Sequence, residues 1–184
     1  MEKKLRIYTP NNSFKIDKRL LILLLLFSIV FLIYSTKSNF PSNEENLELF
    51  GFVFVIITFL YSLFFMISNF FICETTNGEY SGYLIIDNDK ITCNLDVYTI
   101  YDIEKISILS IYFLGKFNGN IKAWERKKSN GVKNYIEIYK KGGECQKYFF
   151  LQTKTENITM FSDELRTYYR FGKLEEQNYK NIVN

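Results

Sequence analysis

The sequence contains no histidine, only two prolines and only three cysteines among its 184 residues. Without histidine the chain cannot build a Ser-His-Asp or Cys-His catalytic centre, bind a metal through imidazole, or sense pH through an imidazole side chain. The cysteines Cys73, Cys93 and Cys145 are odd in number and widely spaced, which fits neither a disulfide framework nor a metal-ligand pattern. Reduced cysteines are typical of the cytosol, and we expect that setting for the part of the chain that carries them.

Motifs of catalysis are missing as well. The chain has no P-loop, no G-x-S-x-G and no H-E-x-x-H pattern. Asp87 and Asp89 lie close together, but they lack the glycine and distal glutamate of a calcium loop, and a turn explains them better. A net charge of +3 is too small to indicate nucleic acid as a partner. We therefore predict a protein that is not an enzyme and has no cofactor and no metal.

Apolar residues are concentrated in two long runs near the N-terminus. The first, Leu20–Thr36, has no charged residue and would be about 25 Å long as a helix, which is short for a ~30 Å hydrocarbon core. The second, Leu49–Ile72, is also uncharged and is long enough to cross with tilt. Residues 37–48 join the two runs. This pattern predicts a transmembrane helical hairpin over residues 20–73.

A cleaved signal peptide is the alternative interpretation of the first run, because a basic segment precedes it. The residues after the run contain no A-x-A-like cleavage site, and a second apolar run follows soon afterwards. These two observations favour the hairpin. The absence of charge within both runs argues against a transporter or a proton pathway, so the hairpin is expected to be an anchor.

Basic residues are distributed unequally around the two runs. Residues 1–19 carry six Lys and Arg residues, whereas the connecting segment carries only Lys37. The positive-inside rule therefore predicts that residues 1–19 are a basic cytoplasmic tail and that the connecting loop is outside. We expect a multi-pass protein of a bacterial cell (inner) membrane with both termini in the cytoplasm.

From residue 78 onward the hydrophobic pattern changes to the period of two that is typical of strands. Turn residues separate the apolar segments, as at Gly142 and Gly143. The expected strands are Tyr83–Ile86, Ile91–Tyr98, Thr99–Ile103, Ile106–Leu114, Asn134–Tyr139 and Lys147–Gln152.

The last element of this domain is expected to be a helix. Between Thr155 and Phe171 the apolar residues recur at helical spacing, and Gly172 is a suitable residue to follow the helix. Residues 173–184 are predicted to be a polar tail. Residues 78–172 thus form one domain, for which we predict a small antiparallel β-barrel or strongly bent sheet that is plugged by the C-terminal helix.

Two apolar helices followed by GYLIIDNDKI, YTIYDIEKISI, NYIEIYKKGG, KYFFLQ and a final helix resemble the PH-like domains of small bacterial membrane proteins. The similarity extends over Gly78–Phe171 and consists mainly of strand order and a D-I-x-x-I turn at Asp102, Ile103 and Ile106. The resemblance implies a half-open barrel capped by a helix, without catalytic residues. Such a fold serves as a docking platform for lipids, peptides or proteins, and it does not specify which of them binds.

The segment Lys116–Lys133 is strongly basic and contains the single tryptophan of the chain. Close to a bilayer, each Lys or Arg contributes ~1 kcal/mol of attraction to anionic headgroups, and tryptophan favours the interface. The alternative is a solvated hairpin loop whose tryptophan packs on its own strands. The candidate membrane- and lipid-binding residues are Lys122, Trp124, Arg126, Lys127 and Lys128.

The sequence leads to one functional hypothesis and one alternative. The leading hypothesis is a membrane-anchored docking module whose cytoplasmic PH-like domain binds a protein or the membrane surface; its expected partners are the bilayer, anionic headgroups and an unidentified protein. The alternative is a two-helix membrane effector whose β-barrel senses a ligand and whose helices then perturb the bilayer. A deep pocket in the barrel would favour the effector, whereas a filled core would favour the docking module.

Overall fold

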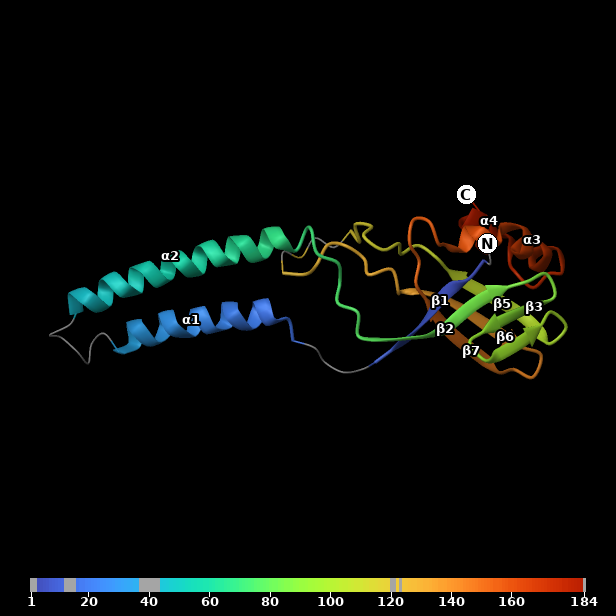
Figure 1. Ribbon diagram of the computed structural model, residues 1–184, viewed down its shortest axis with the longest axis horizontal. Coiled ribbons are helices and arrows are strands. Elements are labelled where there is room, and N and C mark those ends of the chain that lie inside the picture. Colours follow the sequence, from blue (N-terminus) through green and yellow to red (C-terminus); the bar gives the residue numbers. More distant parts are fainter. Residues whose placement is uncertain (1–2, 12–15, 37–43, 120–121, 123, 184) are drawn as a thin grey trace. The chain divides into compact units, whose positions relative to one another are not determined.

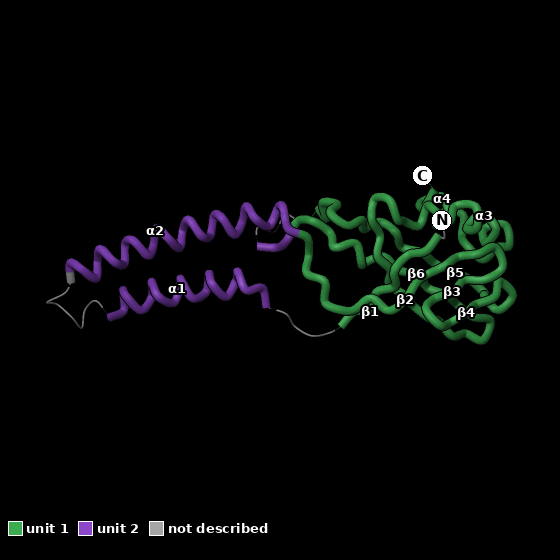
Figure 2. The backbone as a smooth tube through the Cα atoms, in the orientation of Figure 1, with its two compact units in different colours: residues 1–13, 73–120, 127–184 green, residues 14–72, 121–126 purple. Residues whose placement is uncertain are grey.

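The structure, a computed structural model, divides into two compact units (Figure 2). The hairpin unit comprises residues 14–72 and 121–126, and the β unit comprises residues 1–13, 73–120 and 127–184. The structure describes residues 3–11, 16–36, 44–119, 122 and 124–183.

The hairpin unit contains two long apolar helices, α1 (Lys18–Thr36) and α2 (Glu44–Ser68) (Figure 1). The prediction of two such helices is confirmed, although the second begins five residues earlier than expected and ends at Ser68 instead of Ile72. Most of the expected connecting loop, residues 37–43, lies outside the described residues. After Ser68 the backbone continues in tighter turns, in which the N–H groups of Phe70 and Phe71 donate to the carbonyls three residues earlier, both at 3.1 Å.

The buried residues of α2 include one small residue, one polar residue and one phenylalanine. Gly51, Thr58 and Phe65 are buried and follow one another at the seven-residue spacing of a coiled-coil seam. At Gly51 side chains of α1 pack against the backbone of α2, since a Cβ atom there would lie 3.3 Å from Ile33 Cγ2. The Thr58 hydroxyl is satisfied within the helix, where it donates to the carbonyl of Phe54 at 2.7 Å.

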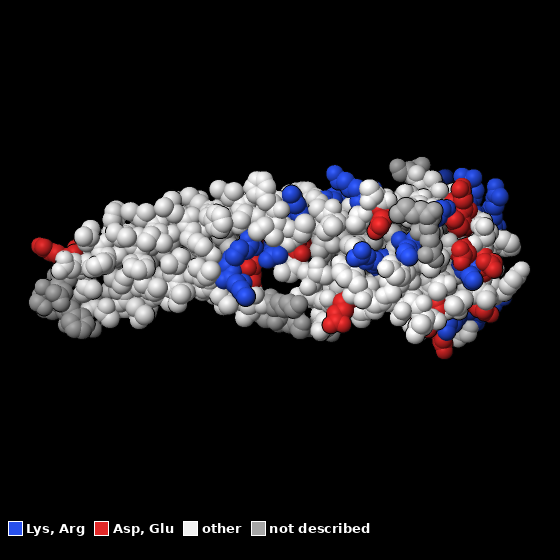
Figure 3. All heavy atoms as spheres, viewed as in Figure 1, with Lys and Arg blue, Asp and Glu red and all other residues white. Residues whose placement is uncertain are grey.

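The large apolar side chains of both helices face outward. Only 6% of the apolar window of α1 and 17% of that of α2 is buried. In Figure 3 the surface of the two helices shows no charged side chain between their ends. The most exposed of these outward residues are Phe31, Leu49, Phe50, Phe59, Phe64 and Phe71.

The β unit contains one antiparallel sheet whose strands follow the order β4-β3-β2-β1-β7-β6-β5. Leu5 and Ile7 on β1 and Ile136 and Ile138 on β6 are among the twenty buried residues of its core. The strands are β1 (Leu5–Pro10), β2 (Gly78–Ile86), β3 (Lys90–Cys93), β4 (Asp96–Thr99), β5 (Ile103–Leu109), β6 (Asn134–Lys140) and β7 (Cys145–Phe150).

Strand β1 corrects the prediction for the N-terminus. Residues 1–19 were expected to be a basic tail, but Leu5–Pro10 form the central strand, which pairs with β2 on one side and with β7 on the other. Leu5 and Ile7 face the core and are almost fully buried. The segment has only two buried aliphatic residues between basic ones, so its periodicity is too short to distinguish a strand from a tail.

The segment Ile91–Tyr98, expected to be one strand, is instead the hairpin of β3 and β4. Cys93 pairs with Asp96, and the two residues between them form the turn. Asn94 adopts a φ of 60°, a left-handed conformation that asparagine tolerates and that two-residue hairpin turns require. The alternation of apolar and polar residues continues through the turn, so the sequence pattern did not indicate that one strand ends and another begins there.

The sheet is not a closed barrel, because β4 and β5 remain at its two edges and do not pair within the described residues. The side chains nevertheless approach across this gap. Tyr98 on β4 and Tyr148 on β7 are joined by a hydroxyl–hydroxyl hydrogen bond of 2.5 Å, and Tyr148 donates to Asp96 at 2.7 Å. The sheet is therefore strongly bent. Of the two predicted forms, a closed β-barrel and a strongly bent sheet, the structure has the second.

Helices pack on the core side of the sheet: the short 3-10 helix η3 (Ile158–Phe161), α3 (Ser162–Arg170) and α4 (Glu176–Val183) (Figure 1). The expected helical stripe of Ile158, Phe161, Leu165 and Tyr168 is buried in the core. Asn157, not Thr155, caps the first turn by accepting from the Thr159 backbone. The expected polar tail 173–184 is wrong, because α4 returns to the core through Ile182.

The C-terminal segment also covers the outer edge of β5. The backbone N–H of Ile106 donates to the carbonyl of Lys173 at 2.7 Å. The Asn178 side chain accepts from the Ile108 N–H at 2.9 Å and donates to the Ile108 carbonyl at 2.7 Å, as a neighbouring strand would. This pairing protects an edge that would otherwise be open to association with other chains.

We expect Ile7→Ala to destabilise the β unit by about 2–5 kcal/mol, since it opens a cavity beside the central strand. The neighbouring exposed residue supplies the control, because Arg6→Ala should change stability by less than about 0.5 kcal/mol. Urea unfolding in detergent, followed by circular dichroism, measures both. Equal and small effects of the two variants would mean that residues 5–10 are not a strand of the sheet.

We expect Asn178→Leu to destabilise the β unit by about 1–3 kcal/mol, because it leaves the N–H and carbonyl of Ile108 without their partners. Asn181→Leu on the same helix is the matched control, since that side chain only accepts from Gln177 on the surface. Thermal unfolding and size-exclusion chromatography test the prediction. Wild-type behaviour of Asn178→Leu in both measurements would contradict it.

Candidate functional site

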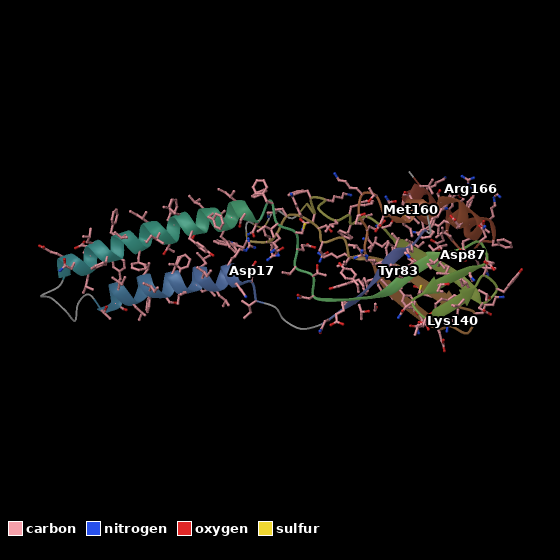
Figure 4. The ribbon with its side chains drawn as sticks, viewed as in Figure 1. Asp17, Tyr83, Asp87, Lys140, Met160 and Arg166 are labelled. Atoms are coloured by element: carbon pink, nitrogen blue, oxygen red, sulfur yellow. The ribbon has the colours of Figure 1, made fainter. Side chains whose placement is uncertain are left out.

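Polar side chains gather at the end of the hairpin unit where α1 begins and α2 ends. We call this group the interfacial cluster; Figure 4 labels one of its members, Asp17, at the start of α1. Its residues are Asp17, Arg19, Phe65, Ser68, Asn69, Trp124 and Arg126.

Asp17 is the N-cap of α1. Its carbonyl accepts from the backbone N–H of Leu20, and its carboxylate accepts from the backbone N–H of Arg19 at 3.0 Å. The same carboxylate receives the Arg19 guanidinium at 2.7 Å and the Arg126 guanidinium at 2.9 Å. One carboxylate therefore caps a helix and holds two cations.

Arg19 connects the start of α1 to the end of α2. Besides Asp17, its guanidinium donates to the Ser68 hydroxyl at 2.8 Å and to the Asn69 side-chain oxygen at 3.1 Å. It also lies over the Phe65 ring, 5.1 Å from the centroid. Asn69 is completely buried in this group. Arg19 thus forms an internal contact of the hairpin, where the sequence suggested only a cation flanking the first run.

Trp124 and Arg126 come from the basic segment and belong to the hairpin unit. The Trp124 ring lies 5.8 Å from that of Phe65, and Arg126 bonds to Asp17. About half of the tryptophan side chain stays exposed. Two of the five predicted lipid-binding residues therefore meet at the end of the hairpin, held by contacts to α1 and α2.

The other three predicted residues are placed differently. Lys122 is exposed and forms a local ion pair with Glu125 at 3.1 Å. Lys127 is only 2% exposed, so the expectation that its side chain contacts headgroups is not supported by this placement. Lys128 belongs to the β unit, where its carbonyl accepts from the Glu74 N–H at 2.7 Å. The basic segment is thus not one continuous cationic surface.

Hydrogen bonds from two guanidinium groups favour the ionised form of the Asp17 carboxyl group. The Arg19 side chain, followed by that of Arg126, holds the pKa of Asp17 well below its ordinary value, against the opposing effect of burial. Asp17 is therefore ionised throughout the physiological range, and together with Arg19 and Arg126 it leaves one net positive charge. Such a group cannot exchange protons near neutrality, but it can attract a phosphate.

Sequence reasoning did not include Asp17 among the candidate residues. An acidic residue directly before an apolar helical run is a recognisable N-cap signal, and it could have identified Asp17. The contact of Arg126 with Asp17 joins residues 109 positions apart, and no local pattern encodes such a distance.

Within the described residues, no group of three or more Cys, Asp and Glu residues could hold a metal ion. In the β unit, an open groove of about 590 Å³ is lined by Thr9, Pro10, Asn11, Glu79 and Ser81. It is a surface feature at the ends of β1 and β2, not a cavity in the core.

Neither a protein-family model, nor a curated protein, nor a solved structure matches this chain. The arguments about function therefore depend on the chain's own residues and contacts.

We expect Asp17→Asn to release Trp124 from Phe65, because asparagine preserves the N-cap but removes the ion pairs with Arg19 and Arg126. The loss should be about 1 kcal/mol, since these side chains are partly exposed. Trp124 is the only tryptophan, so its emission and its quenching by acrylamide report the contact directly. Lys122→Gln is the control and should leave both unchanged.

The same probe tests the pH dependence. A carboxyl whose pKa is lowered by folding contributes stability above its unfolded pKa of about 3.9, and loses it as the pH falls through the folded value. Trp124 emission in the wild-type chain should therefore stay constant from pH 8 to about pH 4 and change only in stronger acid. A transition near neutrality would contradict the ion-pair arrangement.

Proposed function

We propose that the chain is a membrane-anchored docking module: α1 and α2 cross the bilayer as a hairpin, and the β unit binds at or near the cytoplasmic membrane surface. The observation that carries the proposal is the inverted distribution of side chains in the hairpin. Most large apolar residues of both helices lie outside, whereas the buried positions of α2 include Gly51 and Thr58. Water does not tolerate so large an exposed apolar surface, whereas lipid does.

The hydroxyl groups of the helices support this interpretation. Ser28, Ser35 and Thr36 in α1 each donate to the carbonyl four residues earlier, at 2.8 Å. A polar group in hydrocarbon must be satisfied by its own segment, since no water is available there. A buried helix of a soluble protein passes the same length and hydropathy test, but it would be mostly covered by its own chain.

The position of β1 argues against a cleaved signal peptide. Cleavage after α1 would remove Leu5–Pro10, the central strand of the sheet. Because β1 precedes the helices, β2 follows them, and the two strands pair, the helices must cross the membrane an even number of times if they cross at all. This supports both termini on one side, and the basic residues of segment 1–19 favour the cytoplasmic side of a bacterial inner membrane.

The core of the β unit favours docking over ligand sensing. Among the described residues, twenty are buried in one hydrophobic core, most of them from the sheet and from η3, α3 and α4, and this apolar interior is what a docking module would have. The bent sheet with C-terminal helices is compatible with the PH-like resemblance, which remains part of the proposal together with a non-enzymatic role. The expected partners are anionic headgroups at the interfacial cluster and a protein that the β unit recruits.

We expect a cysteine introduced at Ser42, between the two helices, to react with a membrane-impermeant maleimide on intact cells. The native Cys145 is exposed on β7 and should react only after the cells are permeabilised, because the β unit is cytoplasmic. Mass-tag shifts on a gel measure both reactions. Labelling of Cys145 on intact cells would reverse the proposed orientation, and release of the chain by alkaline carbonate would refute the membrane hairpin.

A further inference from the structure

Three large apolar side chains are exposed in the short segment 111–117 of the β unit, between β5 and β6. The exposed fraction is 51% for Ile111, 43% for Leu114 and 55% for Phe117. The chain turns within this segment, where the N–H of Lys116 donates to the Phe113 carbonyl at 3.0 Å. The Lys116 ammonium group folds back on the same turn and donates to the Ile111 carbonyl at 3.2 Å. We call Ile111, Leu114 and Phe117 the apolar turn.

The apolar turn carries no carboxylate that contact with lipid would desolvate. No Asp or Glu occurs between Lys105 and Trp124 in the sequence. On the neighbouring segment, the Glu74 carboxylate accepts from Lys133 at 2.7 Å and from the Asn118 side chain at 3.0 Å. An apolar environment around the turn is therefore not opposed by an unpaired acidic side chain within it.

Backbone pairing fixes how far Phe117 lies from the residue that joins the β unit to the second apolar run. Phe117 pairs with Lys128 as in antiparallel strands, and Lys128 pairs with Cys73 as in parallel strands. Paired strands are about 4.8 Å apart, so Phe117 lies roughly 10 Å from Cys73. Cys73 directly follows Ile72, which is the last residue of the second apolar run.

A second covalent connection to the hairpin unit lies beside Phe117. Residues 121–126 belong to the hairpin unit, and the chain returns to the β unit at Lys127. The backbone N–H of Asn118 donates to the Lys127 carbonyl at 2.9 Å. The strand that contains Phe117 is therefore held close to two places, Cys73 and Lys127, at which the β unit is covalently joined to the hairpin unit.

We propose that the apolar turn, with Phe117 nearest to the hydrocarbon, inserts into the interfacial layer of the bilayer that holds the hairpin. The headgroup region on each side of a bilayer is roughly 5–8 Å thick, so a residue roughly 10 Å from the end of the membrane run can reach it. Interfacial segments bury apolar side chains ~5–10 Å into the boundary between headgroups and acyl chains. Lipid is the occupant because the covalent connections at Cys73 and Lys127 keep the turn at the membrane surface, where contact is effectively intramolecular.

This inference rests on the proposed function, because it requires the hairpin to be in the membrane. The experiment therefore contains a separate test of that requirement. A photoreactive p-benzoylphenylalanine replaces one residue at a time in the full chain: Phe117 in the apolar turn, Phe59 on the outside of α2, or Phe171 beyond the end of α3. Phe171 is the matched control, since it is a phenylalanine of the same unit with a similar exposed fraction of 61%.

Each variant is reconstituted in nanodiscs of phosphatidylcholine, with and without phosphatidylglycerol, and lipid adducts are quantified by mass spectrometry. We expect adducts at Phe59 in both membranes. At Phe117 we expect a yield several fold above that at Phe171, and nearly the same in both membranes, because burial of apolar side chains does not require anionic lipid. Phe171 should give few adducts in either membrane.

Added charge sharpens the test. Ile111→Asp with Leu114→Asp should lower the Phe117 yield several fold, because two carboxylates beside the probe oppose its entry into lipid. Leu95→Asp with Tyr101→Asp adds the same charge at two exposed apolar residues in other turns of the β unit, and it should leave the yield unchanged. Circular dichroism confirms that each variant is folded before its yield is compared.

The contrary results are separable. Adducts at Phe59 with equal yields at Phe117 and Phe171 would overturn the insertion of the apolar turn and leave the membrane hairpin intact. Adducts at Phe117 only in the presence of phosphatidylglycerol would assign the contact to charge attraction and would also overturn the inference. So would crosslinks from Phe117 to a second copy of the chain in place of lipid. No lipid adduct at Phe59 would overturn the proposed function and this inference with it.

Discussion

Strand β1 pairs with β2 on one side and with β7 on the other, so residues that precede the hairpin and residues that follow it share one hydrophobic core. The apolar helices are therefore an insertion between two adjacent strands of a sheet. The β unit cannot complete its core until both ends of the hairpin are on the same side of any membrane that it crosses. The number of times the helices cross a membrane is therefore linked to the folding of the β unit. The distribution of charged residues alone does not impose this link.

The two units differ in where their apolar side chains lie. In the β unit, aliphatic residues such as Ile106, Ile136 and Ile138 lie inside and are fully buried. In the hairpin unit Gly51 and Thr58 are buried, while most of the phenylalanines, although not Phe65, face outward. The free energy of burying apolar area drives the first arrangement. In the proposed lipid surroundings that term would vanish between helices, and close packing with internally satisfied hydroxyl groups would decide the second.

Positive charge occurs at two places with different structural roles. In the interfacial cluster, Arg19 and Arg126 bind the Asp17 carboxylate and join α1, α2 and the Trp124 segment. On the outer face of the sheet, Lys4 and Lys147 lie over tyrosine rings. The first arrangement is a fixed internal network. In the second, Lys147 is also paired with Glu137 at 2.9 Å.

Elements with long or regular patterns were predicted correctly from the sequence, including both apolar helices and the β6–β7 hairpin. The buried stripe from Ile158 to Tyr168 was also foreseen, because 3.6-residue periodicity is visible over a few turns. Short elements were missed. The alternation in Ile91–Tyr98 continued through the turn at Asn94, and α4 has a single buried residue, Ile182, in a polar segment.

By itself, the sequence determined that the chain has an apolar hairpin followed by a β-rich domain, and that it lacks histidine chemistry. These properties follow from the composition and the hydrophobic periodicity of single segments. They do not depend on contacts between segments. Only the tertiary structure decided that Leu5–Pro10 is the central strand, that Arg126 bonds to Asp17, and that aromatic residues of four neighbouring strands, β6, β7, β1 and β2, stand opposite one another. Each of these depends on register or on contacts between distant residues, and pairing energy between strands is known only once the partners are placed.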